Sequence, residues 1–230
     1  MSLRECKICS EFMQRYCSCA EILTDIKPSI EYSADKWKQI TTKILFIAEA
    51  PPFYLKTSNK ATDSYFYNEN EKQLFLDVPT PLSGTLSWNL FTLLGINSDL
   101  SKESKLKEFK KLSCYYIEAL KCRICKFENK MIIKKMLKCC SLFLKRDVLV
   151  IQPKIIVVMG EKALYGLQCC QLFKVLETSS TINALLEQIK QPILSNNIKF
   201  YFIPLPVWRN KIYYESIVEI FNQIKAELKL

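Results

Sequence analysis

The 230-residue chain is 49% hydrophobic and 24% charged, which is the composition of an ordinary globular protein with one well-buried core. It contains no histidine, which excludes Ser-His-Asp and Cys-His nucleophilic sites, zinc sites with histidine ligands and a histidine general acid. Its four glycines are scattered, which excludes the clustered glycine loops that bind dinucleotides or nucleotide phosphates.

The net charge of +10 is concentrated in one part of the chain. Residues 101–154 hold 15 basic and 5 acidic side chains, whereas the rest of the chain is neutral. Such a segment indicates either a face that binds a polyanion such as DNA or a solvated, lysine-rich helical surface. No apolar run approaches the roughly 20 residues that cross a bilayer, so we expect no membrane partner.

Four short apolar runs are typical of strands that are buried on both faces. These runs are 43–48, 114–120, 154–159 and 199–205. Apolar spacing predicts helices over 85–94, 131–151, 161–172 and 211–229. Strands that alternate with helices predict an α/β fold, a three-layer αβα sandwich around a central, mostly parallel four-stranded sheet. We expect one domain over 1–230, with 1–42 as a cysteine-containing segment before the first strand.

Sites in parallel sheets gather at the carboxyl ends of the strands. The corresponding segments here are Glu49–Pro52, Leu120–Cys125, Gly160–Glu161 and Pro204–Arg209. The long loop 53–80 is a second candidate, because it is rich in tyrosine and small polar residues. Its aromatic side chains either stack on an unpaired base or hold the loop against the body, and the second role is expected of any one of them. They are Tyr54, Tyr65, Phe66 and Tyr67.

The start of the chain shows no secretory pattern, because Arg4, Glu5 and Lys7 interrupt any apolar run. We therefore expect an intracellular, cytoplasmic protein whose eleven cysteines are reduced. Cysteines with CxxC spacing then indicate metal or cluster ligation rather than disulfides.

Two cysteine pairs have this spacing, Cys6 with Cys9 and Cys122 with Cys125. Together they would make a four-thiolate zinc site. Alternatively, Cys6, Cys9 and Cys122, together with Cys139 or Cys140, would hold an iron–sulfur cluster, which also takes four thiolates. The residues alone leave both alternatives open.

The motifs, taken in chain order, resemble the iron–sulfur-containing, family 4-like branch of the uracil-DNA glycosylase superfamily. They are an N-terminal CxxC, IAEAPP at 47–52, PLSG at 81–84, EALKCR at 118–123, QPKIIVVMGEKAL at 152–164 and PLPVWR at 204–209. The resemblance covers most of the chain except 53–80 and the region around 171–198. It implies a protein that binds DNA and hydrolyses the N-glycosidic bond of a deaminated or damaged base in base excision repair.

The resemblance also implies roles for individual residues. A [4Fe-4S] cluster would be held by Cys6, Cys9, Cys122 and Cys140. The catalytic carboxylate would be Glu49. Substrate contacts would come from Ala50, Pro51, Leu82, Glu118 and Leu205, and DNA contacts from Val207, Trp208 and Arg209.

Three positions depart from the family pattern. Leu205 stands where the family has its catalytic histidine, Glu118 where an asparagine reads the base, and Leu82 where an aromatic ring stacks on it. Leucine cannot donate a hydrogen bond to a leaving base, and an ionised Glu118 would repel O4 of uracil. Glu118 better suits a base that presents an amino group, unless it is itself protonated.

These departures leave three functions open. The first is a diverged glycosylase, and the second is a non-catalytic DNA-binding protein that retains the fold and the cluster. The third is a nucleic-acid-binding protein with a four-thiolate zinc site. We expect a monomer in each case.

Overall fold

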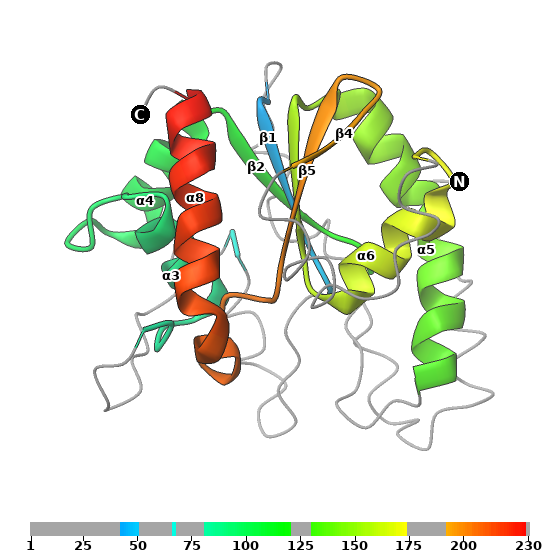
Figure 1. Cartoon of the computed structure of the whole chain (residues 1–230), viewed down its shortest axis with the longest axis horizontal. Coiled ribbons are helices and arrows are strands. Elements are labelled where there is room, and N and C mark those ends of the chain that lie inside the picture. The colour runs from blue at the N-terminus through cyan, green and yellow to red at the C-terminus, as the bar shows by residue number, and fades with distance from the viewer. Residues whose placement is uncertain (1–41, 51–65, 68–80, 121–129, 174–191, 229–230) are drawn as a thin grey trace.

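The computed structural model describes residues 42–50, 66–67, 81–120, 130–173 and 192–228, with the side chains of Trp208 and Leu228 left out. Within these ranges a sheet lies between two layers of helices (Figure 1). Its strands are β1 (Ile44–Ala48), β2 (Cys114–Glu118), β3 (Ile155–Met159), β4 (Ile193–Ser195) and β5 (Ile198–Ile203). The helices are α3 (Leu86–Leu93), α4 (Lys102–Lys111), α5 (Lys130–Ile151), α6 (Glu161–Cys170), the 3-10 helix η5 (Trp208–Tyr213) and α8 (Tyr214–Leu228).

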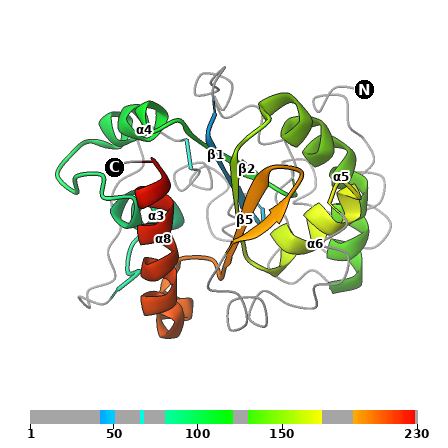
Figure 2. The same cartoon turned by 45° about the horizontal axis from the view of Figure 1, so that its top comes forward.

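The strand order of the sheet is β2-β1-β3-β5-β4. β1 pairs in parallel with β2 and β3, and β3 pairs in parallel with β5, whereas β4 runs antiparallel to β5. Helices α3, α4 and α8 lie on one side of the sheet and α5 and α6 on the other, as Figures 1 and 2 both show. Every residue of β1, β2 and β3 is buried, as expected of parallel strands covered by helices on both faces.

The four predicted strands are confirmed, with ends that differ by a few residues, but the predicted four-stranded sheet is wrong by one strand. The additional strand, β4, has only three residues, so it has no apolar run that a pattern could detect. It is joined to β5 by Asn196 and Asn197, whose φ angles of +50° and +62° are those of a type I′ hairpin turn.

The helices differ from the prediction in two places. Helix α4 was not predicted, and its N-cap is Ser101, whose hydroxyl accepts a hydrogen bond from the Ser104 N–H at 3.2 Å. The predicted helix 211–229 begins as α8 at Tyr214, after the 3-10 helix η5. Ile212, an apolar residue within the predicted range, lies in η5 and is 78% exposed. No helix in the described part of the chain is both long and apolar enough to cross a bilayer.

Phe66 and Tyr67 cover the free side of β2, which is an edge strand. The Phe66 ring stacks on Tyr116 at 4.0 Å between centroids. The Tyr67 hydroxyl donates to the Tyr116 carbonyl at 3.0 Å and accepts from the Tyr116 N–H at 2.8 Å. Both rings hold their segment against the body, as predicted, and the Tyr67 hydroxyl satisfies two edge groups of β2 that would otherwise be open to another strand. Tyr54 and Tyr65 lie outside the described residues.

Replacing Tyr67→Phe removes the hydroxyl that both donates to and accepts from Tyr116. We expect the free energy of unfolding to fall by about 1–3 kcal/mol, because two backbone groups at a buried position lose their partner. Urea denaturation measures this value. Tyr213→Phe, at a partly buried tyrosine in η5, is the control, and equal losses in the two variants would contradict the proposed role of the Tyr67 hydroxyl.

Candidate functional site

A cavity of about 540 Å³ opens where the carboxyl end of the sheet meets α5 and α6. Glu49 follows β1, Gly160 follows β3 and Arg209 lies in η5 after β5, so the chain brings three strand ends to this edge. In Figure 1 it is the lower edge of the sheet. The cavity is lined by Glu49, Lys130, Ile133, Lys134, Leu137, Glu161, Lys162, Leu164, Tyr165, Gln168 and Arg209.

Glu49 lies at the N-terminus of α6. Its Oε2 accepts a hydrogen bond from the Lys162 Nζ at 2.5 Å, and its Oε1 accepts from the Lys162 backbone N–H at 3.4 Å. The side chains of Glu49 and Lys162 are 14% and 33% exposed, so the ion pair is reached from the cavity but is largely shielded from water. A helix N-terminus favours a carboxylate, so the predicted catalytic residue is held in place by α6 itself.

Gly160 allows this close approach. Its φ is +90°, and a Cβ built on it would lie 2.6 Å from the Glu49 Oε1, closer than any real contact. Any residue other than glycine would therefore displace the carboxylate as well as strain the backbone. The glycine that the sequence places at a strand-to-helix junction thus determines where Glu49 lies.

Positive charge predominates in the cavity lining. Four of the lining side chains are basic and two are acidic. The Lys134 Nζ lies 5.4 Å from the centre of the Tyr165 ring. Burial and, to a smaller degree, the neighbouring Cys169 raise the pKa of Tyr165. A cavity of this charge suits an anionic ligand.

Asn89, which the sequence analysis did not single out, joins two of the motifs. Its Nδ2 donates to the carbonyls of Gly84 and Pro206, each at 2.8 Å, and to that of Leu82 at 3.1 Å, while its Oδ1 accepts from the Gly84 N–H at 3.0 Å. The side chain is buried on α3, so these bonds hold the PLSG segment against the PLPVWR segment. In the sequence, this role is indicated only by the isolated amide side chain of Asn89 in the largely apolar run TLSWNLFTLL.

The three positions that depart from the family pattern do not line the cavity. Leu82 is 6% exposed with φ +62°, and its side chain packs in the core. Glu118 is 2% exposed and lies opposite Ala48 in the register of β1 and β2. Leu205 is partly buried, and its carbonyl accepts from the Asn210 Nδ2 at 2.8 Å.

The other predicted contact residues are only partly placed by the structure. Ala50 and Val207 are partly buried, and Arg209 is exposed at the cavity. Trp208 begins η5, and Pro51 lies outside the described residues. The structure thus brings Glu49 and Arg209 together in one cavity, and their predicted roles stay predictions.

Of the candidate metal ligands, only Cys139 and Cys140, both on α5, lie within the described residues. Cys140 is 2% exposed on the inward stripe of that helix, and Cys139 beside it is partly exposed. Cys6, Cys9, Cys122 and Cys125 lie outside the described residues. Among the residues that are described, no three cysteine or carboxylate side chains gather closely enough to bind a metal.

A family model described as the Uracil DNA glycosylase superfamily matches residues 36–225. The chain belongs to this superfamily. No curated protein matches it with significance. The residues matched to the uracil-DNA glycosylase superfamily contain every described strand and the cavity with Glu49 and Arg209, so the predicted family and its α/β fold are confirmed. The family 4-like, iron–sulfur branch stays a prediction.

We expect Gly160→Ala to lower the free energy of unfolding by about 1–3 kcal/mol, because alanine is strained at this φ and its methyl group displaces Glu49. The matched control is Gly95→Ala, at φ +79° with nothing within 4 Å of the new methyl group, which introduces the backbone strain alone. Chemical denaturation of both variants isolates the Glu49 contact. Equal losses would show that the contact contributes nothing to stability.

Proposed function

We propose that this member of the superfamily binds DNA along the carboxyl edge of its sheet and hydrolyses the N-glycosidic bond of a deaminated or damaged base. The observation that carries this proposal is the Glu49–Lys162 pair, 2.5 Å apart, in a cavity where basic side chains outnumber acidic ones by four to two. The pair combines a hydrogen-bond acceptor with a positive charge, and hydrolysis of a glycosidic bond requires both.

The reaction requires a base taken out of the stack, a water held near the anomeric carbon and a leaving base stabilised as an anion. Glu49 accepts a hydrogen bond from the water while the water oxygen bonds to the anomeric carbon. The N-glycosidic bond breaks, and its electron pair goes to the base. The proton of the water passes first to Glu49 and then to the base. Lys162 supplies the charge that stabilises the anion, a role that Leu205 cannot take over from the family's histidine.

DNA binding rests on the basic side chains around the cavity. Lys130 and Lys134 lie in the first turns of α5, and the exposed Lys135 and Lys138 continue along the helix. Arg209 approaches from η5 on the other side. Such side chains bind phosphates and orient the duplex without reading its sequence. Either Val207 or Trp208, which adjoin Arg209, supplies the apolar wedge that opens the base stack.

A second candidate is a non-catalytic DNA-binding protein with the same fold. The position of Leu205 favours it, because this residue offers no side-chain donor and its carbonyl is already bonded to Asn210. The low exposure of Glu118, 2%, favours it as well, because the position that would read the base is closed.

Duplex and single-stranded oligonucleotides that carry uracil, hypoxanthine or xanthine distinguish the two candidates, since alkali cleaves the strand wherever a base has been removed. We expect cleavage of at least one substrate. Glu49→Gln and Lys162→Met should each slow the single-turnover rate about a hundredfold or more. Lys107→Met is the matched control on α4, where the exposed Lys107 pairs with Glu103 at 2.8 Å.

Failure of cleavage on every substrate would contradict catalysis. Salt-sensitive DNA binding that is lost in a Lys134→Ala, Arg209→Ala double variant would then establish the non-catalytic candidate. Absence of salt-sensitive DNA binding in the unmodified protein would contradict both candidates.

For the cysteines, we propose a [4Fe-4S] cluster with a structural role, held by Cys6, Cys9, Cys122 and Cys140. Ligation of this kind stabilises the fold by tying the N-terminal segment to α5 and the loop before it. Cys139 is the alternative fourth ligand. A zinc ion bound by both CxxC pairs, with Cys125 as the fourth ligand, is the alternative to the cluster.

The packing of α5 supports the choice of Cys140. Its inward stripe also carries Leu137 and Leu144, whose methyl groups lie 3.6 and 3.4 Å from a Cβ built on Gly166. The same Cβ would lie 2.9 Å from the Cβ of Ala119. Ala119 precedes Cys122 by three residues, so the stripe that carries Cys140 passes near the start of the segment that carries Cys122.

The metal content of purified protein tests this assignment. We expect iron, with visible absorption, in the unmodified protein and in Cys125→Ala, and its loss in Cys140→Ala. The two variants are matched because each removes one thiol. One equivalent of zinc that is lost in Cys125→Ala and kept in Cys140→Ala would contradict the cluster.

A further inference from the structure

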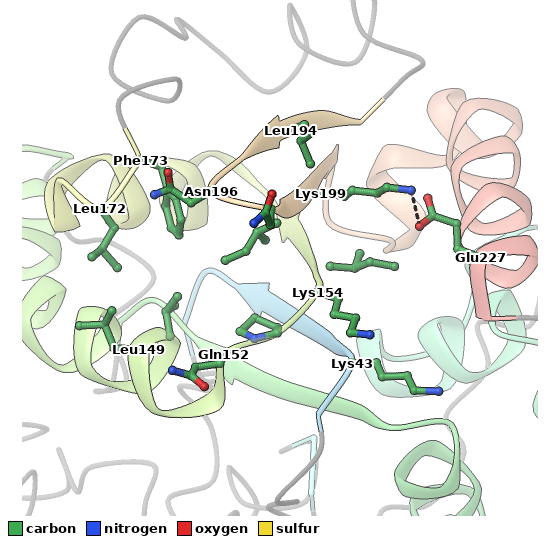
Figure 3. Close-up of a pocket in the computed structure, with 15 residues that line it drawn as sticks. Lys43, Leu149, Gln152, Lys154, Leu172, Phe173, Leu194, Asn196, Lys199 and Glu227 are labelled. Carbon is green, nitrogen blue, oxygen red and sulfur yellow. Dashed lines mark hydrogen bonds and ion pairs between the residues drawn. The ribbon is translucent and has the colours of Figure 1, made fainter.

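A second cavity, of about 730 Å³, lies at the opposite edge of the sheet, where the strands begin (Figure 3). Its walls come from the C-terminal end of α5, the β4–β5 hairpin and Glu227 near the end of α8. The proposed glycosylase function uses none of these residues. The cavity therefore requires a separate explanation.

Three lysines form one side of this cavity. Lys43 directly precedes β1, Lys154 directly precedes β3, and Lys199 is the second residue of β5. The Lys154 N–H donates to the Lys43 carbonyl at 2.9 Å, and the Lys199 N–H donates to the Lys154 carbonyl at 3.0 Å. The parallel register thus places three distant lysines side by side, and Figure 3 shows their side chains extended in one direction.

The positive charge of these lysines is only partly compensated. Glu227 accepts from the Lys199 Nζ at 2.7 Å, and it is the sole carboxylate among the described residues that line the cavity. Lys43 and Lys154 are exposed, and the structure shows no ion pair between either of them and a described carboxylate. Two ammonium groups therefore face an incoming ligand, and a ligand with two nearby negative charges would complement them.

The other side of the cavity is apolar. Leu149 on α5 and Leu194 on β4 line it and are 55% and 65% exposed. Phe173 packs against Phe200 with ring centroids 4.6 Å apart, so this part of the wall is anchored in the core. Large apolar side chains that face water around a hollow mark a site of protein–protein contact.

The polar groups between these two sides come from rigid turns. Gln152 follows the last turn of α5 with φ +49°, and Asn196 and Asn197 form the tip of the β4–β5 hairpin. All three line the cavity. Amide side chains both donate and accept, so they match the N–H and C=O groups of an extended peptide.

We infer that this cavity is a docking site for an acidic segment of a partner protein that carries a leucine or phenylalanine anchor. The carboxylates of the segment pair with Lys43 and Lys154, and its apolar anchor packs between Leu149 and Leu194. Leu149 and Leu194 at the cavity are both more than half exposed, which favours a segment with an apolar anchor over a mononucleotide. Because the site lies at the edge opposite Glu49, the partner and DNA bind together, and the inference does not depend on the proposed function.

Fluorescence anisotropy with three labelled peptides of equal length tests the inference on the full chain. The probes are an Asp-Leu repeat, an Asp-Ser repeat that lacks the apolar anchor, and a Lys-Leu repeat that reverses the charge. We expect the Asp-Leu peptide to bind about tenfold or more tightly than either of the others, a difference of about 1.4 kcal/mol. Added salt should weaken its binding.

Variants of the cavity locate the binding. A Lys43→Glu, Lys154→Glu double variant and a Leu149→Ser, Leu194→Ser double variant should each weaken binding of the Asp-Leu peptide about tenfold or more. The matched control is Lys107→Glu with Lys111→Glu on α4, where both side chains are also exposed. Circular dichroism verifies folding, and DNA binding measured on the same variants should be unchanged, which separates this inference from the proposed function.

The inference is overturned if the Asp-Leu peptide fails to bind, or if it binds the Lys43/Lys154 variant as tightly as the unmodified protein. Equal weakening in the α4 control would also overturn it, because the effect would then reflect net charge alone. Displacement of the peptide by dAMP would assign the cavity to a nucleotide instead.

Discussion

Parallel pairing of β1 with β2 on one side and β3 on the other determines where the functional side chains of this protein lie. Because these strands all begin at one edge and end at the other, Glu49 and Gly160 emerge together, while Lys43 and Lys154 lie together at the far edge. The pairing continues past the strands, since the Leu120 N–H donates to the Glu49 carbonyl at 3.0 Å. Helices cover both faces of the sheet and exclude water from these strands. A shift in register would displace buried side chains, so the register is strongly specified.

Glu49 connects the fold to the proposed chemistry. Its carboxylate is stabilised by the N-terminus of α6 and by Lys162, and it occupies space that only a glycine at position 160 leaves open. The same contacts that stabilise the helix therefore place an acceptor and a cation at the wall of a basic cavity. In a chain without histidine, Lys162 thus places a positive charge beside a carboxylate at the carboxyl edge of the sheet.

The two edges of the sheet have different characters. The carboxyl edge carries several basic side chains around the Glu49–Lys162 pair, and these basic side chains suit a polyanion. The opposite edge carries lysines beside exposed leucines, a combination that suits an acidic and partly apolar protein segment. The strands separate these surfaces, so a partner at one edge leaves the other accessible. The proposed DNA surface and the proposed protein surface therefore share no residues.

The sequence by itself determined the strands, because runs that are buried on both faces are apolar throughout, and it determined the inward stripe of α5, because helical spacing is local. It also indicated the superfamily and the place of Glu49 after β1. Only the tertiary structure decided that Lys162 pairs with Glu49 across 113 residues and that Asn89 bonds to Pro206 across 117. The same holds for β4, which a hairpin turn creates from three residues, and for the lysines at the strand starts. These contacts depend on strand order and register, which are set by packing of the whole chain and leave no periodic trace in any one segment.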